Sequence, residues 1–185
     1  MKRRVDLYML LGDPVEGSLS PIIHNAAFRS LKMPAIYVAV RTLSDYLGDM
    51  VNGIRALGIK GFNVTIPHKV TVIDLLDELD VSASSVEAVN TVKNKRGKLV
   101  GFNTDGLGAL QALTDELGSV KGKRVLLLGA GGAARAIAYA LAGEGCEVKV
   151  ANRTPSRAEA LASIVRKNLG REIQVLSLEK RELAK

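Results

Sequence analysis

The chain has 185 residues, 47% hydrophobic and 24% charged, which is ordinary for a folded protein of one large or two small domains. It has no apolar stretch of the ~18 residues that a membrane span needs, and its single cysteine excludes an intrachain disulfide and a cysteine-only metal cluster. The net charge of +7 comes from scattered basic residues, with small groups at 2–4, 93–98 and 121–124, and aromatics are only 4%, so no platform for stacking nucleic-acid bases is present. These features predict a cytoplasmic protein without a signal peptide that binds small anionic molecules, and neither membranes nor nucleic acids.

The N-terminal part of the chain alternates strand-like and helix-like segments. A strand is predicted at 6–11, ending in a Gly-Asp-Pro turn, and a helix is predicted from Ser20, as its N-cap, and Pro21 to about Leu31. There follow a strand at 36–40, a helix at 43–57, a strand at 61–64, a helix from Pro67 to about Leu79, and a hairpin of 88–92 and 98–102. This alternation indicates α/β architecture with a mostly parallel sheet.

The C-terminal part repeats one simple unit. A helix at 104–117 precedes a strand at 124–128, a helix at 133–142, a strand at 147–151, a helix at 155–168 and a strand at 173–176. This βαβαβ unit is half of a dinucleotide-binding fold, which normally has two such halves. We therefore expect an N-terminal α/β domain at 1–104, a connecting helix at 105–120, and a Rossmann-type domain at 121–185 of which only the first half is present.

A glycine motif joins the first strand and helix of that unit. The segment from Gly129 to Ala134 fits G-x-G-x-x-G/A directly between strand and helix, where dinucleotide binding requires it. Gly129 permits the tight turn, Gly131 lets the backbone approach a pyrophosphate, and Ala134 is small enough for close packing. The helix N-terminus offers N–H groups to the anion. The candidate cofactor contacts are Gly129, Ala130, Gly131, Gly132 and Ala133; the alternative is a glycine-rich turn without a ligand.

The end of the next strand predicts which dinucleotide is bound. An NAD enzyme places an acidic residue there for the ribose hydroxyl, whereas this chain has Asn152, Arg153 and Thr154, with Arg157 one helical turn on. Guanidinium groups bind a 2′-phosphate by charge-assisted hydrogen bonds. The pattern therefore predicts NADP rather than NAD, the alternative being that both arginines are solvated surface charges.

Several further motifs occur in a fixed order along the chain. They are Gly12-Asp13-Pro14-Val15, Ser18-Leu19-Ser20-Pro21, His24-Asn25, the run from Gly61 to Lys69 (GFNVTIPHK), Ala88-Val89-Asn90-Thr91-Val92, and Gly101-Phe102-Asn103-Thr104-Asp105-Gly106. Together with the glycine loop and Asn152-Arg153-Thr154, this set resembles the shikimate dehydrogenases over the whole chain. Two positions depart from the family pattern: Gly17, where a larger residue is frequent, and Glu87, where Gly usually precedes Ala-Val-Asn-Thr.

The resemblance implies reversible NADPH-dependent reduction of 3-dehydroshikimate to shikimate, a step of aromatic amino-acid biosynthesis, in a cytoplasmic monomer or homodimer. It assigns Lys69 as the catalytic acid/base with Asp105 beside it. The substrate carboxylate would be bound by Ser18 and Ser20, and the ring hydroxyls by Asn63, Thr65, Asn90 and Asp105. Ser20 could instead serve as a helix cap. No metal site is expected, because His24 and His68 lack a nearby cluster of ligands.

Two alternatives remain at this level. One is a quinate/shikimate dehydrogenase of relaxed specificity. The other is a truncated chain that binds substrate and NADP with little turnover, because only half of a Rossmann domain is present. In that case we expect the nicotinamide to be poorly positioned and turnover to be at least about a hundredfold slower than in a complete enzyme.

Overall fold

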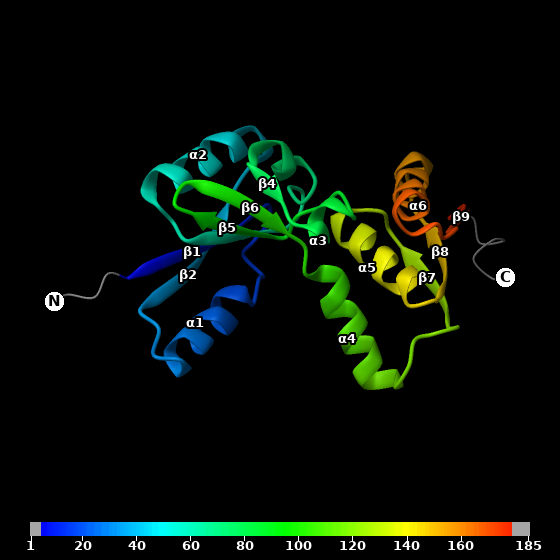
Figure 1. Ribbon diagram of the computed structural model, residues 1–185. Helices are drawn as coiled ribbons and strands as arrows, with labels where there is room; N and C mark the ends of the chain where they lie inside the picture. Colours follow the sequence, from blue (N-terminus) through cyan, green and yellow to red (C-terminus); the bar gives the residue numbers. More distant parts are fainter. Residues whose placement is uncertain (1–4, 179–185) are drawn as a thin grey trace. The chain divides into compact units, whose positions relative to one another are not determined.

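The computed structural model describes residues 5–178, and contacts group the chain into two units (Figure 1). The first unit comprises the chain up to Asp80 together with Val89–Phe102, and the second comprises Val81–Ala88 and the chain from Asn103 on. Within the second unit, the buried side chains of Val86 and Ala88 pack against Ala136.

The first unit is built on a six-stranded sheet. Its strands are β1 (Asp6–Gly12), β2 (Ala35–Arg41), β3 (Gly61–Val64), β4 (Glu78–Leu79), β5 (Thr91–Lys95) and β6 (Lys98–Phe102), in the order β2-β1-β3-β5-β6-β4. Only β5 runs against the others, because it pairs antiparallel with β3 and β6 while the remaining pairs are parallel. This confirms the expected α/β fold with a mostly parallel sheet.

Two helices cover opposite faces of this sheet (Figure 1). Helix α2 (Leu47–Leu57), preceded by a short 3₁₀ turn, buries Leu47, Val51 and Ile54, which share one helix face. It ends at Gly58, whose φ of 65° is the left-handed conformation that favours glycine at a helix end. Helix α1 (Ser20–Ser30) packs through Phe28 on the other face, beside Leu10 and Tyr37.

Helix α1 is also joined to the edge of the sheet. The side-chain amide of Asn25 donates to the Tyr37 carbonyl at 2.8 Å and accepts its N–H at 2.9 Å. These groups belong to β2, the edge strand, whose backbone would otherwise lack partners on that side. The Asn25 side chain thus supplies the donor and the acceptor that a neighbouring strand would offer to Tyr37.

The helix predicted from Pro67 to Leu79 is wrong. The chain forms turns after Pro67, a 3₁₀ helix at Thr71–Leu75, and then strand β4 at Glu78–Leu79. The N–H groups of Asp77 and Asp80 donate to the carbonyls of Leu99 and Gly101 on the β6 side. Pairing with β6 therefore determines the conformation here, although the apolar residues have helical spacing. This pairing is a tertiary contact, which the local sequence pattern does not predict.

Two smaller expectations also need correction. Ser20 is the first residue of α1 and not its N-cap, a position held by Leu19 without a side-chain cap bond. In the hairpin, β5 begins at Thr91 rather than at Ala88. Arg96 and Gly97, which form its two-residue turn, have φ of 58° and 94°, as tight hairpin turns require.

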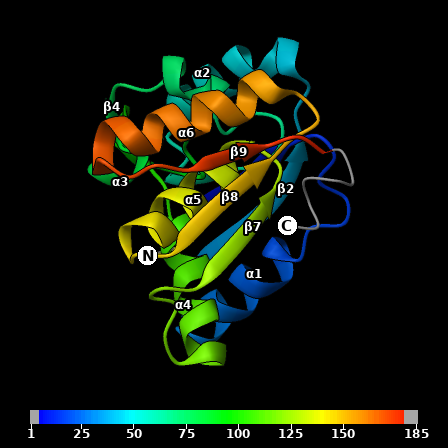
Figure 2. The same ribbon diagram turned by 90° about the vertical axis from the view of Figure 1, so that its right-hand side faces the viewer.

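The second unit contains the expected βαβαβ arrangement. Its strands β7 (Arg124–Leu128), β8 (Glu147–Ala151) and β9 (Gln174–Leu176) form a parallel sheet in chain order. Helices α5 (Gly132–Gly143) and α6 (Pro155–Leu169) share one core with Val148 and Val150 of β8, so both cover the same face (Figure 2). The short helix α3 (Val81–Ser84) was not predicted, and α4 (Asp105–Leu117) was.

Close approach explains one glycine of α4. A Cβ at Gly106 would lie 2.5 Å from the carbonyl oxygen of Ala136, so the α4–α5 contact requires glycine. Cys146 is buried in the core of this unit, and its thiol donates to the Val120 carbonyl at 3.1 Å.

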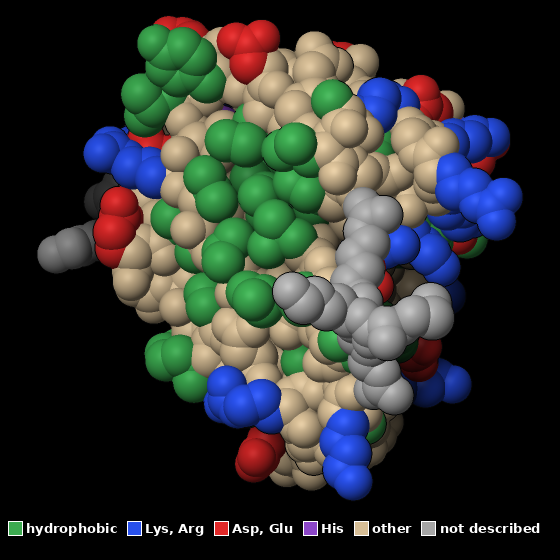
Figure 3. Space-filling model, turned by 90° about the vertical axis from the view of Figure 1, so that its left-hand side faces the viewer, with side chains coloured by type: hydrophobic (Ala, Val, Ile, Leu, Met, Phe, Trp, Pro, Cys, Tyr) green, Lys and Arg blue, Asp and Glu red, His purple; other side chains and the backbone are tan. Residues whose placement is uncertain are grey.

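The first unit also carries exposed apolar side chains. On α1 and β2, Ile22, Ile23 and Ile36 are exposed, and Figure 3 shows hydrophobic side chains gathered in the middle of the face that looks left in Figure 1. Among residues 5–178, no helix has the length and apolar character needed to span a membrane.

Gly12, at the end of β1, provides a test of how closely β1 packs against Thr65 and Ile66. A Cβ there would lie 2.2 Å from Thr65 Cγ2 and 2.9 Å from the Ile66 carbonyl oxygen. We expect Gly12→Ala to lower the free energy of unfolding by about 1–3 kcal/mol, the usual cost of overpacking. Urea unfolding followed by circular dichroism measures it. Gly17→Ala is the control, because a Cβ at Gly17 meets nothing within 4 Å; equal midpoints for the two variants would contradict the prediction.

Candidate functional site

The candidate substrate residues of the first unit lie at one edge of its sheet. Parallel strands end at the same edge, and the antiparallel β5 begins there. Asn63 and Thr65, at the end of β3, therefore meet Asn90, just before β5, and the register pairs Asn63 with Thr91. The chemistry of this edge thus comes from strand ends, where α/β proteins build their sites.

The amide of Asn63 lies at the centre of a hydrogen-bond network. Its Nδ2 donates to the Asn90 carbonyl at 3.1 Å and to Thr91 Oγ1 at 2.9 Å. Thr91 Oγ1 in turn donates to Asn90 Oδ1 at 2.9 Å. Both predicted residues, Asn63 and Asn90, are therefore brought together, and hydrogen bonds within the protein orient their side-chain amides.

Tyr37 is a member of this network that the sequence did not identify. Its hydroxyl donates to Asn63 Oδ1 at 2.8 Å, and its ring stacks on His24 with centroids 4.3 Å apart. Burial raises the pKa of Tyr37 to about 12, although a hydrogen bond with Ser20 acts in the opposite direction. The only signal in the sequence was the hydroxyl of a tyrosine in the otherwise apolar run at 36–40.

Ser18 and Ser20 flank the start of α1. The Ser18 hydroxyl oxygen accepts the N–H of Ser20 at 3.2 Å, so Ser18 does the local capping that was expected of Ser20. The Ser20 hydroxyl is hydrogen-bonded to Tyr37, which links both serines to the Asn63 network.

Lys69 lies in a turn and not at the start of a helix. Two features hold this segment in place. The Lys69 carbonyl accepts the Val89 N–H at 2.7 Å, and the side chain of the neighbouring His68 is fully buried. His68 Nε2 lies 2.6 Å from the Thr42 carbonyl oxygen. Since a carbonyl only accepts, Nε2 must donate, and His68 anchors the turn that carries Lys69 to the segment after β2.

Asp105 belongs to the second unit, as the first residue of α4. Its N–H donates to Asn103 Oδ1 at 2.9 Å, and Asn103 Nδ2 donates to the Ala88 carbonyl at 2.9 Å. The buried Asn103 thus fixes the start of α4 and the position of Asp105. Because Lys69 belongs to the first unit and Asp105 to the second, their pairing stays a prediction.

Glu87 departs from the family pattern, and the structure explains why glycine is usual there. Its φ of 49° lies in the left-handed region that favours glycine. Arg135 compensates in part, donating to the Glu87 carbonyl at 3.2 Å and lying 3.7 Å from its carboxylate.

The glycine turn and the arginines lie at one edge of the second sheet. The N–H of Gly129 donates to the Ala151 carbonyl at 2.8 Å, so the turn after β7 adjoins the turn after β8. Gly129 has a φ of 112°, and the space where a Cβ of Gly131 would lie is open. Ala134 packs against the core, as predicted.

The residues predicted to bind the 2′-phosphate form an anion clamp in the turn after β8 and at the start of α6: Asn152, Arg153, Thr154 and Arg157. Asn152 Nδ2 donates to the Thr154 carbonyl at 2.8 Å, which shapes this turn, and Thr154 is the N-cap of α6. Arg153 and Arg157 are exposed, and within the described chain neither side chain has a hydrogen bond or ion pair. Both guanidinium groups are thus available to an anion.

The structure therefore separates the predicted residues into two sets. The first unit holds Ser18, Ser20, Asn63, Thr65, Lys69 and Asn90, and the second holds Asp105 with the glycine turn and the arginines. Within residues 5–178, no group of three or more His, Cys, Asp or Glu side chains could hold a metal ion. Fold and residues together define a two-unit α/β protein with a Rossmann-type half-domain.

Comparison with known proteins shows which family this chain resembles. A family model for the shikimate dehydrogenase substrate binding domain matches residues 10–92, and one for shikimate / quinate 5-dehydrogenase matches residues 111–183. The chain is 48% identical over 174 residues to shikimate dehydrogenase (NADP(+)) of Methanocaldococcus jannaschii, covering 92% of this chain and 61% of that protein.

Solved structures agree with these matches. Shikimate 5-dehydrogenase from Listeria monocytogenes, in complex with shikimate and NAD, has a TM-score of 0.86 and 34% identity, over 100% of this chain and 68% of that one. A shikimate dehydrogenase in complex with NADP+ has a TM-score of 0.88 and 47% identity, over 94% of this chain and 62% of that one. The chain belongs to the shikimate dehydrogenase family. It spans about three fifths of the length of the curated relatives that it matches.

Tyr37 gives this site a pH dependence that can be measured. Its pKa is raised from 10.0 to about 12, so the neutral hydroxyl stabilises the fold fully below pH 10, and this contribution is lost as the pH rises through about 12. We expect Tyr37→Phe to remove that part of the fall in unfolding free energy.

Urea unfolding across this pH window provides the measurement, and Tyr46→Phe is the control because Tyr46 is 60% exposed. The prediction fails if Tyr37→Phe leaves the pH dependence intact or if Tyr46→Phe reduces it equally.

Proposed function

We propose that the protein catalyses the reversible NADPH-dependent reduction of 3-dehydroshikimate to shikimate, as a step of aromatic amino-acid biosynthesis. The observation that carries this proposal is the oriented cluster of Asn63 and Asn90 at the sheet edge that also bears the anchored turn of Lys69. Membership of the shikimate dehydrogenase family supports it.

Short polar side chains suit a substrate with several hydroxyl groups and a carboxylate. Thr65 and Asn90 are short and polar and would contact ring hydroxyls, and Asn63, whose two N–H groups are bonded to Asn90 and Thr91, would add its Oδ1 as an acceptor. The hydroxyls of Ser18 and Ser20, at the start of α1, would bind the carboxylate. Asp105, at the start of α4, would complete the hydroxyl contacts from the second unit.

Lys69 is the proposed acid/base. Reduction of a ketone places negative charge on its oxygen, and a lysine ammonium can donate the proton that this oxygen needs. In the reverse direction the neutral amine must accept it. Because the Lys69 backbone and the neighbouring His68 are both anchored, the side chain starts from a defined position, which the proton transfer requires.

The second unit fits a dinucleotide phosphate. Backbone N–H groups at the start of α5, the open space at Gly131 and the exposed Arg153 and Arg157 form a surface for a pyrophosphate and a 2′-phosphate. Bound NADPH would supply the hydride. This chain's own residues would hold its adenosine end, with Gly129, Ala130, Gly131, Gly132 and Ala133 around the pyrophosphate.

A related activity on quinate is the second candidate, because the family model for residues 111–183 describes both substrates. A third reading is a protein that binds substrate and NADP with little turnover. Steady-state assays with shikimate and quinate, each with NADP and NAD, distinguish the first two. Binding of both ligands without turnover would favour the third. The oligomeric state, monomer or homodimer, stays a prediction.

Lys69→Ala tests the assignment of the acid/base. We expect kcat for shikimate oxidation to fall roughly 10²–10⁴-fold, the usual contribution of a positioned acid/base, with a much smaller change in KM. Lys167→Ala, an exposed lysine in the last turn of α6, should leave both constants unchanged. A rise in KM with an unchanged kcat would assign Lys69 to binding instead.

Cofactor choice is tested by replacing both arginines of the clamp. Arg153→Ala with Arg157→Ala should weaken NADP binding at least about tenfold more than NAD binding, since each charge-assisted bond contributes ~1.5–3 kcal/mol. Fluorescence titration of each reduced cofactor provides the dissociation constants. Arg171→Ala removes an exposed charge elsewhere in the unit and should not alter the ratio. Equal losses for NADP and NAD would show that the arginines do not bind the 2′-phosphate.

A further inference from the structure

The opposite edge of the sheet in the first unit, away from the candidate substrate residues, carries a cavity. A cavity of about 500 Å³ is lined by Arg55 and Gly58 at the end of α2, by Lys60 before β3, and by residues 93–97 of β5 and its turn. Lys60 precedes β3 and the hairpin turn follows β5, whereas the substrate residues lie where β3 ends and β5 begins. The cavity is thus separate from the candidate active site.

The lining of this cavity is strongly cationic. Five of its residues carry positive charge, and none carries a carboxylate: Arg55, Lys60, Lys93, Lys95 and Arg96. Arg55 pairs with Asp77 at 2.7 Å, and Lys60 lies 3.8 Å from Asp6. In the described chain, the side chains of Lys93, Lys95 and Arg96 have no hydrogen bond or ion pair.

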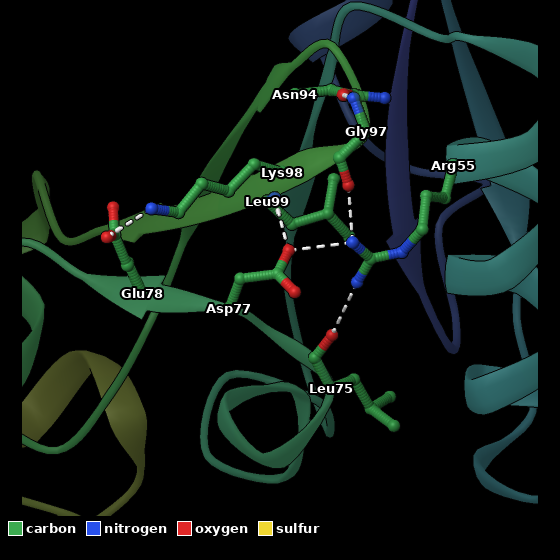
Figure 4. Close-up of polar contacts among 8 residues, drawn as sticks. All are labelled: Arg55, Leu75, Asp77, Glu78, Asn94, Gly97, Lys98 and Leu99. Atoms are coloured by element: carbon green, nitrogen blue, oxygen red, sulfur yellow. Dashed lines mark hydrogen bonds and ion pairs between the residues drawn. The ribbon is translucent and has the colours of Figure 1, made fainter.

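Hydrogen bonds among Arg55, Asp77 and Gly97 hold the hairpin turn beside these cations (Figure 4). The Arg55 guanidinium donates to the Asp77 carboxylate and to the Gly97 carbonyl in the hairpin turn. Asp77 also accepts the Leu99 N–H at 2.6 Å, and Asn94 Oδ1 accepts the Gly97 N–H at 2.7 Å. The hairpin turn is therefore held in place before a ligand arrives, which lowers the entropic cost of binding.

Lys93, Lys95 and Arg96 are exposed, and three like charges around one hollow give it a positive potential that attracts anions. The C-terminal end of α2 adds only about half a negative charge, and Arg55 in its last turn offsets it. An anion with several charges could contact all three cations.

The size and the lining of the cavity restrict the ligand. A volume of this order is typical of small-molecule pockets, and the lining contains no aromatic side chain on which a nucleic-acid base could stack. We propose that this pocket binds a small anion carrying two or more phosphate groups. Inorganic polyphosphate and the polyphosphate tail of a nucleotide share this chemistry.

Amide chemical shifts of the 15N-labelled chain at constant ionic strength test the proposal, with tripolyphosphate and ATP as separate probes. We expect tripolyphosphate to shift the amides of Lys95 and Gly97 saturably. The variant Lys93→Ala with Lys95→Ala should weaken this binding at least about tenfold, because each lysine contributes charge-assisted contacts. Tighter binding of ATP than of tripolyphosphate at the same amides would identify a nucleotide as the source.

Two control variants locate the effect. Lys121→Ala with Lys123→Ala removes the same charge from another basic group, and Arg153→Ala with Arg157→Ala removes the proposed NADP clamp; both should leave the shifts at Gly97 intact. Single Lys95→Ala, with its own spectrum as evidence of folding, serves if the double variant unfolds. The proposal is overturned if the pocket variant binds as the parent does, or if an RNA oligonucleotide binds these amides more tightly than tripolyphosphate does. Neither result depends on turnover of shikimate.

Discussion

Residues 65–69, which include the candidate site residues Thr65 and Lys69, are held by hydrogen bonds to segments at or next to the ends of several strands. The Thr65 N–H donates to the Leu11 carbonyl in β1, and the Lys69 carbonyl accepts the Val89 N–H. The buried His68 adds an anchor after β2. Because a Cβ at Gly12 would overlap Thr65, this segment can lie so close to β1 only where β1 ends in glycine. The site is therefore a consequence of strand ends brought together by the sheet.

Local pattern predicted most of the elements because apolar periodicity and helix-stop signals lie within each segment. The βαβαβ unit, with its glycine turn, followed from sequence alone. The segment after Pro67 did not, because its conformation depends on pairing with β6, about twenty residues later in the chain. Such partners are non-local, and a helix-like spacing of apolar residues is compatible with either outcome. The packing of Val86 and Ala88 against Ala136 did not follow from the sequence for the same reason, since Ala136 lies far along the chain.

Motifs identified the polar residues of the site but not the contacts that orient them. Asn63 and Asn90 were predicted as ligands, and the structure adds that they hold one another and that Tyr37 holds Asn63. Tyr37 was missed because a tyrosine in an apolar strand is ordinary core until its hydroxyl is given a partner. The buried, stacked ring and the raised pKa both follow from the tertiary structure, which no spacing rule contains.

The alternation of side chains along β7 shows where the second unit is least supported. Val125 and Leu127 pack under the helices, whereas Leu126 and Leu128 are 44% and 66% exposed on the other face. Fully burying a leucine stabilises a protein by about 1.5–3 kcal/mol, and the two exposed leucines contribute only part of this. The interpretation of this unit as half of a Rossmann domain accounts for the exposure, because complete domains carry helices on both faces of the sheet. The exposure of the two leucines and the glycine turn after β7 thus fit the same interpretation. In it, β7 has the sequence of a central strand, although in the described chain it lies at an edge of the sheet.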